Sequence, residues 1–273
     1  MENGVYRKIL GARDHAPLVT LRGEIGASKM ESRLMQDRIM LTKSILGGRN
    51  ELVKEVLRKM RGDRENGWNT KLNQYLREIG LEYGDIVRTS GREIKKRVRR
   101  LDTEKWEREL ESKETLGLYR KYKGIIKEER IYDNRYSSEL LYGARANALG
   151  LNDWKRHQGG SMRCDLCGWE REDLIHFLVE CEKLENRRDR AFLRGLGGED
   201  SEDTVGKALF ETEGEDLERV KRMLQDLWFT RKVMTEKIKK EREMRQEAGG
   251  SGNTERPDPH NTITISGSDQ IRS

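Results

Sequence analysis

The scarcity and placement of proline constrain this chain more than any other feature of its sequence. Its 273 residues include only 3 Pro, at positions 17, 257 and 259, so almost the whole interior lacks the residue that most reliably interrupts an α-helix. Hydrophobic residues make up 34% of the chain and charged residues 38%, which limits the core to thin layers between helices. We therefore expect a mainly α protein rather than an all-β or collagen-like one.

Apolar residues recur at helical spacing along most of the chain. The pattern predicts successive helices over residues 30–45, 52–60, 72–79, 90–101, 103–110, 119–126 and 137–148. Ser90 is a suitable N-cap for one of these helices, and Asp102 or Thr103 for the next. A long, charge-rich helix is expected from Glu215 to about Glu247.

Positive charge is concentrated in the first part of the chain. Lys+Arg 55 exceed Asp+Glu 49 overall, and the first hundred residues contain ten more basic than acidic residues. On a helix over 91–100, Ile94 and Val98 would face inward while the outside carries Lys95, Lys96, Arg97, Arg99 and Arg100. Such a run is often merely solvated, but few acidic residues lie nearby to neutralise it. We therefore favour contact with nucleic acid phosphates.

The most specific motif uses every cysteine in the chain. Cys164, Cys167, His176 and Cys181 have the spacing C-x2-C-x8-H-x4-C, and Gly168 favours a tight turn after the first pair. Three thiolates and one imidazole complete the shell of a structural Zn²⁺, with no open position for a catalytic water. The alternative is that the cysteines are buried small hydrophobic residues. We expect one structural Zn²⁺ per chain.

The second ligand pair has an unfavourable spacing for an α-helix. His176 and Cys181 lie five residues apart in an apolar run that predicts a short helix. On an ideal helix of 3.6 residues per turn, their side chains would point about 140° apart. We therefore expect the helix to loosen or end near Glu180.

Basic and aromatic residues surround this motif. The candidate phosphate contacts are Arg145, Lys155, Arg156, Arg163, Arg187 and Arg188. Trp154 and Trp169 lie among them, and each either stacks on an unpaired base or packs around the metal. We favour core packing for Trp169 and leave both alternatives open for Trp154.

Further landmarks extend the motif in both directions. They are Ala144-Arg145 with Leu149, the segment Leu151-Asn152-Asp153, C-x-L-C-G from Cys164, the acidic pair Glu172-Asp173, and H-F-L-x-x-C from His176. With these landmarks, residues 132–188 resemble the C-terminal zinc-knuckle region of non-LTR (LINE-type) retrotransposon reverse transcriptases. Scattered residues upstream are similar to the linker and thumb-like helical region of the same family.

These observations predict four regions. A basic helical bundle over residues 1–130 resembles the linker and thumb, and a small zinc-knuckle region follows over 131–195. A helical extension covers 196–247, and the Gly-, Ser- and Pro-rich tail over 248–273 is expected to be disordered. The resemblance implies a nucleic acid-binding module that contacts RNA or single-stranded regions.

The resemblance also implies what this chain lacks. Polymerases of the family hold two Mg²⁺ ions with an aromatic-x-Asp-Asp motif, and this sequence contains no Asp-Asp pair. We therefore expect a piece of such a protein, or a host protein derived from one, that is not an enzyme and has neither a polymerase nor an endonuclease site.

No run approaches the roughly 18 apolar residues of a membrane span, and the N-terminus lacks a signal peptide's apolar stretch. We expect an intracellular protein of the nucleus or cytoplasm that is not secreted. The alternative function is a protein-interaction scaffold in which residues 215–247 form a coiled coil that pairs with itself.

Overall fold

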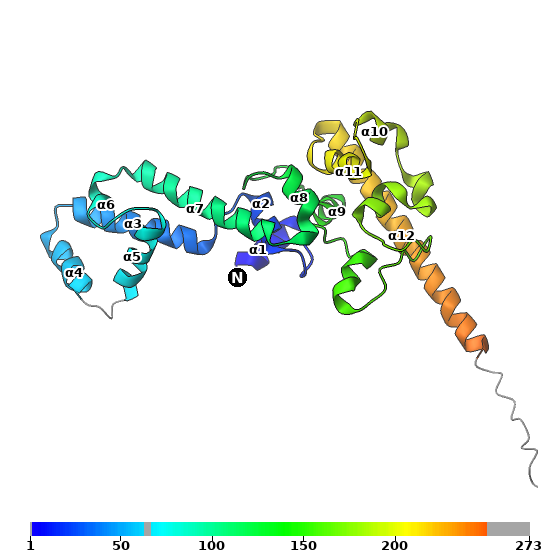
Figure 1. Cartoon of the computed structure of the whole chain (residues 1–273), viewed down its shortest axis with the longest axis horizontal. Coiled ribbons are helices and arrows are strands. Elements are labelled where there is room, and N and C mark those ends of the chain that lie inside the picture. Colours follow the sequence, from blue (N-terminus) through cyan, green and yellow to red (C-terminus); the bar gives the residue numbers. More distant parts are fainter. Residues whose placement is uncertain (1, 63–66, 250–273) are drawn as a thin grey trace, which may run out of the picture.

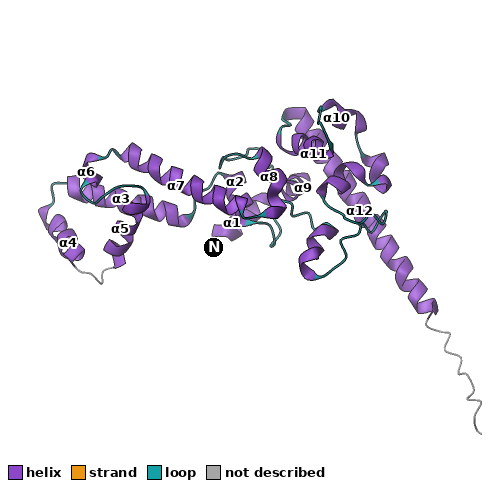
Figure 2. Ribbon diagram, in the orientation of Figure 1, coloured by secondary structure: helices purple, strands orange, loops and turns teal. Residues whose placement is uncertain are grey.

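The computed structural model describes residues 2–62 and 67–249. Over these residues the secondary structure is helical and contains no β-strand, which confirms the mainly α prediction (Figure 2). None of the described helices combines the length and the apolar character needed to cross a membrane. The tail predicted to be disordered, 248–273, lies outside the described residues from residue 250 onward.

The first half of the chain forms one end and the middle of an elongated molecule (Figure 1). Its helices are α1 (Glu2–Leu10), α2 (Leu18–Ile25), α3 (Met30–Gly47), α4 (Glu51–Gly62), α5 (Gly67–Glu78), α6 (Asp85–Arg88), α7 (Gly91–Glu111), η1 (Glu114–Leu116) and α8 (Gly117–Tyr122).

The second half forms the other end, from which the last helix projects (Figure 1). Its helices are α9 (Tyr136–Arg145), η2 (Asn152–Gln158), η3 (His176–Glu180), η4 (Glu182–Arg187), α10 (Arg190–Gly195), α11 (Ser201–Phe210) and α12 (Gly214–Gly249).

The helices at the first end form a small bundle with its own apolar core. Ile39 of α3, Leu72 and Leu76 of α5, and Ile94 of α7 are all buried there. α7 begins where the sequence predicts, because the Ser90 hydroxyl accepts a hydrogen bond from the third backbone N–H of the helix. From this bundle, α7 extends toward the middle of the molecule (Figure 1).

α7 is longer than the sequence predicts. It is continuous over 21 residues, so the predicted helix start at Asp102 or Thr103 is wrong. Asp102 is instead buried in the middle of the helix, where its carboxylate accepts hydrogen bonds from Arg22 at 3.2 Å and from Ser32 at 2.7 Å. These partners, distant in sequence, outweigh the preference of aspartate for helix ends.

The apolar clusters follow the predicted regions only in part. Tyr142 of α9 packs with Leu21 of α2, and its hydroxyl lies 2.9 Å from that of Thr20, so residues on both sides of the 130/131 boundary share a core. Phe177 and Leu227 likewise belong to one cluster across the 195/196 boundary. The knuckle region and the helical extension therefore form a single packed unit.

Replacing Asp102 tests the buried ion pair between α2 and α7. We expect Asp102→Ala to lower the free energy of unfolding by about 3–5 kcal/mol, because the buried Arg22 guanidinium loses its hydrogen-bonded countercharge and keeps only Glu109, at 3.7 Å. Chemical denaturation followed by circular dichroism measures this change. Glu104→Ala, which removes the exposed ion pair with Arg100 on the same helix, should leave the midpoint nearly unchanged. Equal effects of the two variants would contradict a structural role for the buried pair.

Candidate metal centre

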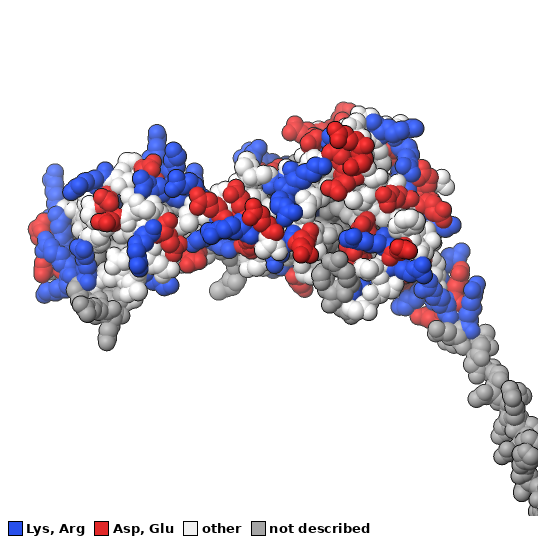
Figure 3. Space-filling model, in the orientation of Figure 1, with Lys and Arg blue, Asp and Glu red and all other residues white. Residues whose placement is uncertain are grey.

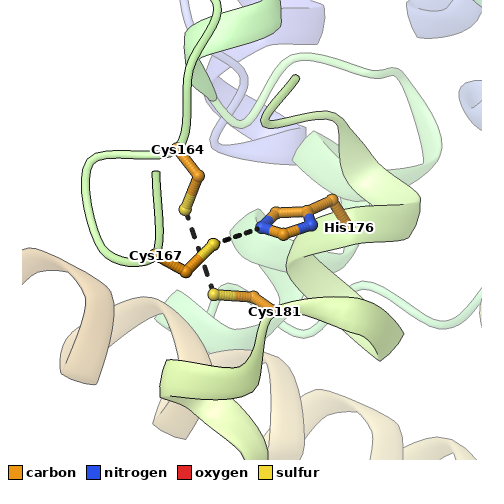
Figure 4. A group of neighbouring side chains, drawn as sticks. All are labelled: Cys164, Cys167, His176 and Cys181. Carbon is orange, nitrogen blue, oxygen red and sulfur yellow. Dashed lines mark hydrogen bonds between the residues drawn. The ribbon is translucent and has the colours of Figure 1, made fainter. Parts of the chain in front are cut away.

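A tight turn presents the first two cysteines of the motif. The Gly168 N–H donates to the Cys164 C=O at 2.9 Å, and the Cys164 N–H donates to the Trp169 C=O at 2.9 Å. Gly168 has a φ of 78°, a left-handed conformation that glycine adopts without steric cost. The turn places both sulfurs on one side of the loop, as the spacing predicts (Figure 4).

A single π-helical turn presents the other two ligands. In η3 the Cys181 N–H donates to the His176 C=O at 2.7 Å, which is an i to i+5 hydrogen bond. The extra residue in this turn brings side chains five residues apart to the same face of the helix. The prediction that the helix loosens near Glu180 is therefore confirmed, in the form of a π turn.

The four donor atoms lie close enough to share one ion. They are all within 4.8 Å of one another, with 3.9 Å between the sulfurs of Cys164 and Cys181 and 3.3 Å from the Cys167 sulfur to His176 Nε2 (Figure 4). Two sulfurs bound to a tetrahedral Zn²⁺ at about 2.3 Å are separated by about 3.8 Å. Three of the four side chains are buried, and all three cysteines are free thiols. The cluster can therefore hold one metal ion.

The electrostatic environment suits these donors. The Cys164 thiol hydrogen-bonds to the Cys181 sulfur, which raises the pKa of Cys164 and lowers that of Cys181. Burial lowers the pKa of His176, which favours the neutral imidazole that a metal requires. A divalent cation at this position would displace the remaining thiol protons, so metal binding weakens as the pH falls.

Two carboxylates flank the ligands. Glu180 Oε2 lies 3.9 Å from His176 Nδ1, a buried nitrogen with no hydrogen-bond partner among the described residues. Glu172 is 1% exposed, and its Oε1 lies 3.8 Å from the Cys164 sulfur. A carboxylate beside the free ring nitrogen of a metal-bound histidine orients that ligand, and Glu180 lies in this position.

Glu172 also connects the metal ligands to the long helix α12. Arg231 of α12 donates to both of its carboxylate oxygens, at 2.7 and 2.5 Å, and the Asn152 N–H donates at 2.9 Å. The sequence identifies Glu172 only as a member of an acidic pair and gives no indication of Arg231. No sequence signal points to this arginine, because it lies 59 residues from its partner.

The two tryptophans near the motif are both partly exposed. Trp169 is 59% exposed, and its ring lies parallel to that of His176 with centroids 6.2 Å apart, so the prediction of core packing is wrong. Trp154 is 38% exposed and packs against His15.

Two of the predicted phosphate contacts are interior residues. Arg145 is 4% exposed and donates to Glu24 at 3.0 Å and to the Leu209 C=O at 2.7 Å. Arg188 is 8% exposed and donates to the Leu178 C=O at 2.7 Å. Because both guanidinium groups are enclosed and paired, the prediction that they contact nucleic acid is wrong.

The other basic residues around the knuckle lie at the surface. Lys155, Arg163 and Arg187 are exposed and form no ion pair within residues 2–62 and 67–249. The side chain of Arg156 lies outside the described part of the structure. These residues remain predicted contacts.

The basic run on α7 separates into two groups. Arg97 pairs with Glu93 at 2.9 Å, and Arg100 lies 3.5 Å from Glu104. Lys95, Lys96 and Arg99 are exposed, and in the described structure they form no ion pair. Figure 3 shows Lys and Arg side chains clustered along the upper edge of the end bundle, where Figure 1 places α7.

Arg92 belongs with the second group, although the sequence analysis did not include it. With Lys95, Lys96 and Arg99 it follows the spacing i, i+3, i+4, i+7, so the four residues share one helix face. This spacing is the signal that identifies it. The four residues, here called the α7 basic face, line a surface depression of about 510 Å³.

Metal analysis tests the ligand set. We expect about one zinc per purified chain, lost in Cys164→Ser, Cys181→Ser and His176→Ala together with part of the near-UV circular dichroism signal. His157→Ala is a matched histidine control that should keep the metal. Equal metal content in the wild type and the ligand variants would remove the assignment.

Replacing Arg231 tests the connection between the ligands and α12. We expect Arg231→Ala to weaken zinc binding about 10- to 100-fold, because it leaves the buried Glu172 carboxylate without its countercharge beside the Cys164 sulfur. Competition with a chromophoric chelator measures this affinity. Arg222→Ala, at an exposed position of the same helix, should leave the affinity unchanged. An unchanged affinity in Arg231→Ala would show that Glu172 does not influence the ligands.

Comparisons with known proteins add no assignment for this chain. No family model, curated protein or solved structure gives a significant match to it. The support for the fold and for the Cys3His cluster is therefore their geometry alone.

Proposed function

We propose that this chain is a zinc-stabilised, nucleic acid-binding module of the kind that follows the polymerase in non-LTR retrotransposon reverse transcriptases. In this proposal the ion in the Cys3His cluster is Zn²⁺ and has a structural role. The ligand is RNA or a single-stranded region. The proposal includes no polymerase step, because the sequence contains no Asp-Asp pair to bind two Mg²⁺ ions.

The observation that carries the proposal is the α7 basic face. Arg92, Lys95, Lys96 and Arg99 are exposed together along about 10 Å of helix, the rise of seven residues. Among the residues that the structure describes, no acidic side chain lines the depression that they form. Four clustered cations without countercharges attract a polyanion and release its counterions on binding.

The charge around this face affects its acidic neighbour. The pKa of Glu93 is lowered, first by the hydrogen bond from Arg97 and also by the charges of Lys96 and Arg100. The single carboxylate on this turn is therefore ionised and already engaged. It does not neutralise the four cations of the α7 basic face.

A second depression extends the path from the same face. It has a volume of about 420 Å³, shares Arg99 with the first and continues to Arg33 of α3 and Tyr6 of α1. The Arg33 guanidinium donates to the Tyr6 hydroxyl at 2.7 Å. Two adjoining depressions with cations along both suit an extended backbone better than a compact anion.

The zinc contributes to binding through folding. Its ligands order a region whose surface carries Lys155, Arg163 and Arg187, while Arg145 and Arg188 stabilise the interior of that region. Contacts made by such exposed side chains are salt-dependent and depend little on sequence.

The alternative, a coiled-coil scaffold, has less support. Leu217, Leu224 and Leu227 of α12 pack into the cluster with the knuckle region, which occupies much of the apolar stripe of this helix. Phe229 and Val233 are exposed one turn apart and are the residues that would favour such a contact. Sedimentation analysis that finds a dimer lost on Phe229→Ala would support the scaffold.

A salt titration of RNA binding tests the proposal. We expect Lys95→Ala/Lys96→Ala/Arg99→Ala to weaken binding to a labelled single-stranded RNA and to reduce the slope of log affinity against log salt by about 2, since each phosphate contact contributes about 0.7. Fluorescence anisotropy at several salt concentrations measures both quantities.

A charge-matched variant is the control for this titration. Lys237→Ala/Lys239→Ala/Lys240→Ala removes the same net charge from exposed positions of α12 and should retain the wild-type slope. Wild-type affinity that does not change with salt, or equal losses in both triple variants, would contradict binding through the α7 basic face.

A further inference from the structure

A small cavity adjoins the metal centre at a junction of segments that are distant in sequence. Its volume is about 140 Å³, and its lining includes His15 from the N-terminal segment, Trp154 from η2 and Asp173 from the knuckle. Neither the metal ligands nor the α7 basic face line it. The cavity is therefore a separate candidate binding site.

One wall of the cavity is aromatic. The rings of Trp154 and His15 lie 4.8 Å apart at an angle of 37°, and Trp154 remains 38% exposed. A partly covered indole offers a flat apolar surface whose free side accepts a second ring. Stacking on such a surface is how proteins bind unpaired bases without regard to sequence.

The polar groups of the cavity are held in place by their neighbours. Arg171 donates to both carboxylate oxygens of Asp153, at 2.9 and 3.1 Å. Asp173 accepts the His176 N–H at 2.9 Å. Each carboxylate keeps further lone pairs for a ligand. Two fixed acceptors beside an aromatic wall match a ring that carries N–H donors on its edge.

A cation lies next to this polar edge. An adjoining cavity of about 170 Å³ shares Asp153 and Asp173 with the first and adds Arg171, whose side chain is 53% exposed. A nucleotide with its base in the first cavity would place its phosphate within reach of such a group. The arrangement thus matches the three parts of a nucleotide: flat ring, N–H edge and anion.

We propose that the cavity between Trp154 and Asp173 binds one unpaired nucleotide, with the base stacked on Trp154, its N–H groups donating to the two carboxylates and its phosphate near Arg171. This inference rests on the proposed function and adds a base-dependent site to it. Adenine, cytosine and guanine carry exocyclic amino groups, whereas uracil offers only a single ring N–H. The site therefore prefers the first three bases.

Binding of the four nucleoside 5′-monophosphates, measured by calorimetry, tests the inference. We expect AMP, CMP and GMP to bind more tightly than UMP, and Trp154→Ala to weaken their binding at least about fivefold. Asp153→Asn should reduce the preference over UMP even if Trp154→Ala is poorly folded. Phe229→Ala, which removes an exposed aromatic ring of α12, should bind as the wild type does.

The outcomes separate this inference from the proposed function. Lys95→Ala/Lys96→Ala/Arg99→Ala should bind mononucleotides normally while losing affinity for RNA. If RNA binds but mononucleotides do not, or if both cavity variants bind as the wild type does, the cavity is not a nucleotide site and the proposed function stands. If mononucleotides bind but RNA shows no salt-dependent affinity, the proposed function fails while the cavity remains.

Discussion

The hydrogen bond from the Cys181 N–H to the His176 C=O, at 2.7 Å, is the contact on which the knuckle depends. An α-helical turn here would point the two side chains apart, and no four-donor cluster would form. The π turn inserts one residue, so both ligands face the Cys164 turn while Phe177 and Leu178 still face the apolar cluster with α12. A single π turn therefore directs two ligand side chains toward the cluster and two apolar side chains toward the core.

Elsewhere in the chain, buried guanidinium groups hold segments together, a role that a larger apolar core has in other proteins. With only 34% hydrophobic residues, the chain joins segments distant in sequence through enclosed ion pairs. The pairs are Arg22 with Asp102, Arg145 with Glu24, and Arg231 with Glu172. The planar fork of arginine suits such sites because it satisfies several acceptors at once. Each pair tolerates only one arrangement of its helices, since a displaced partner would leave a charge buried alone.

The features that could be predicted from the sequence are those determined by nearby residues. Ser90 begins α7 through a bond three residues away, and the spacing of the cysteines and His176 already implied their cluster. The interior position of Arg145 could not be predicted in the same way, because its sequence neighbours do not distinguish a buried arginine from an exposed one. Arg145 is buried because it forms an ion pair with Glu24, which lies 121 residues away. No local sequence pattern indicates that contact. The sequence around Asp102 likewise resembles a helix cap, because it does not show the distant partner Arg22 that binds the carboxylate inside the helix.

The two surfaces proposed to bind nucleic acid depend on the metal to different degrees. The α7 basic face lies on a bundle whose buried core cluster comes from residues 35–98, so its cations keep their spacing without help from the knuckle. The cavity depends on the knuckle directly: Asp173 is bonded to the His176 N–H, and the Asp153 N–H donates to the Glu172 C=O at 3.1 Å. A metal ion bound by the cluster would therefore also fix the acceptors of the cavity, because its binding free energy is coupled to folding. By linkage, a base that binds only the ordered cavity favours the metal-bound form to the same extent. Loss of the metal should remove the base-dependent part of the affinity together with the contacts of Lys155, Arg163 and Arg187, and leave the part that depends on the α7 basic face.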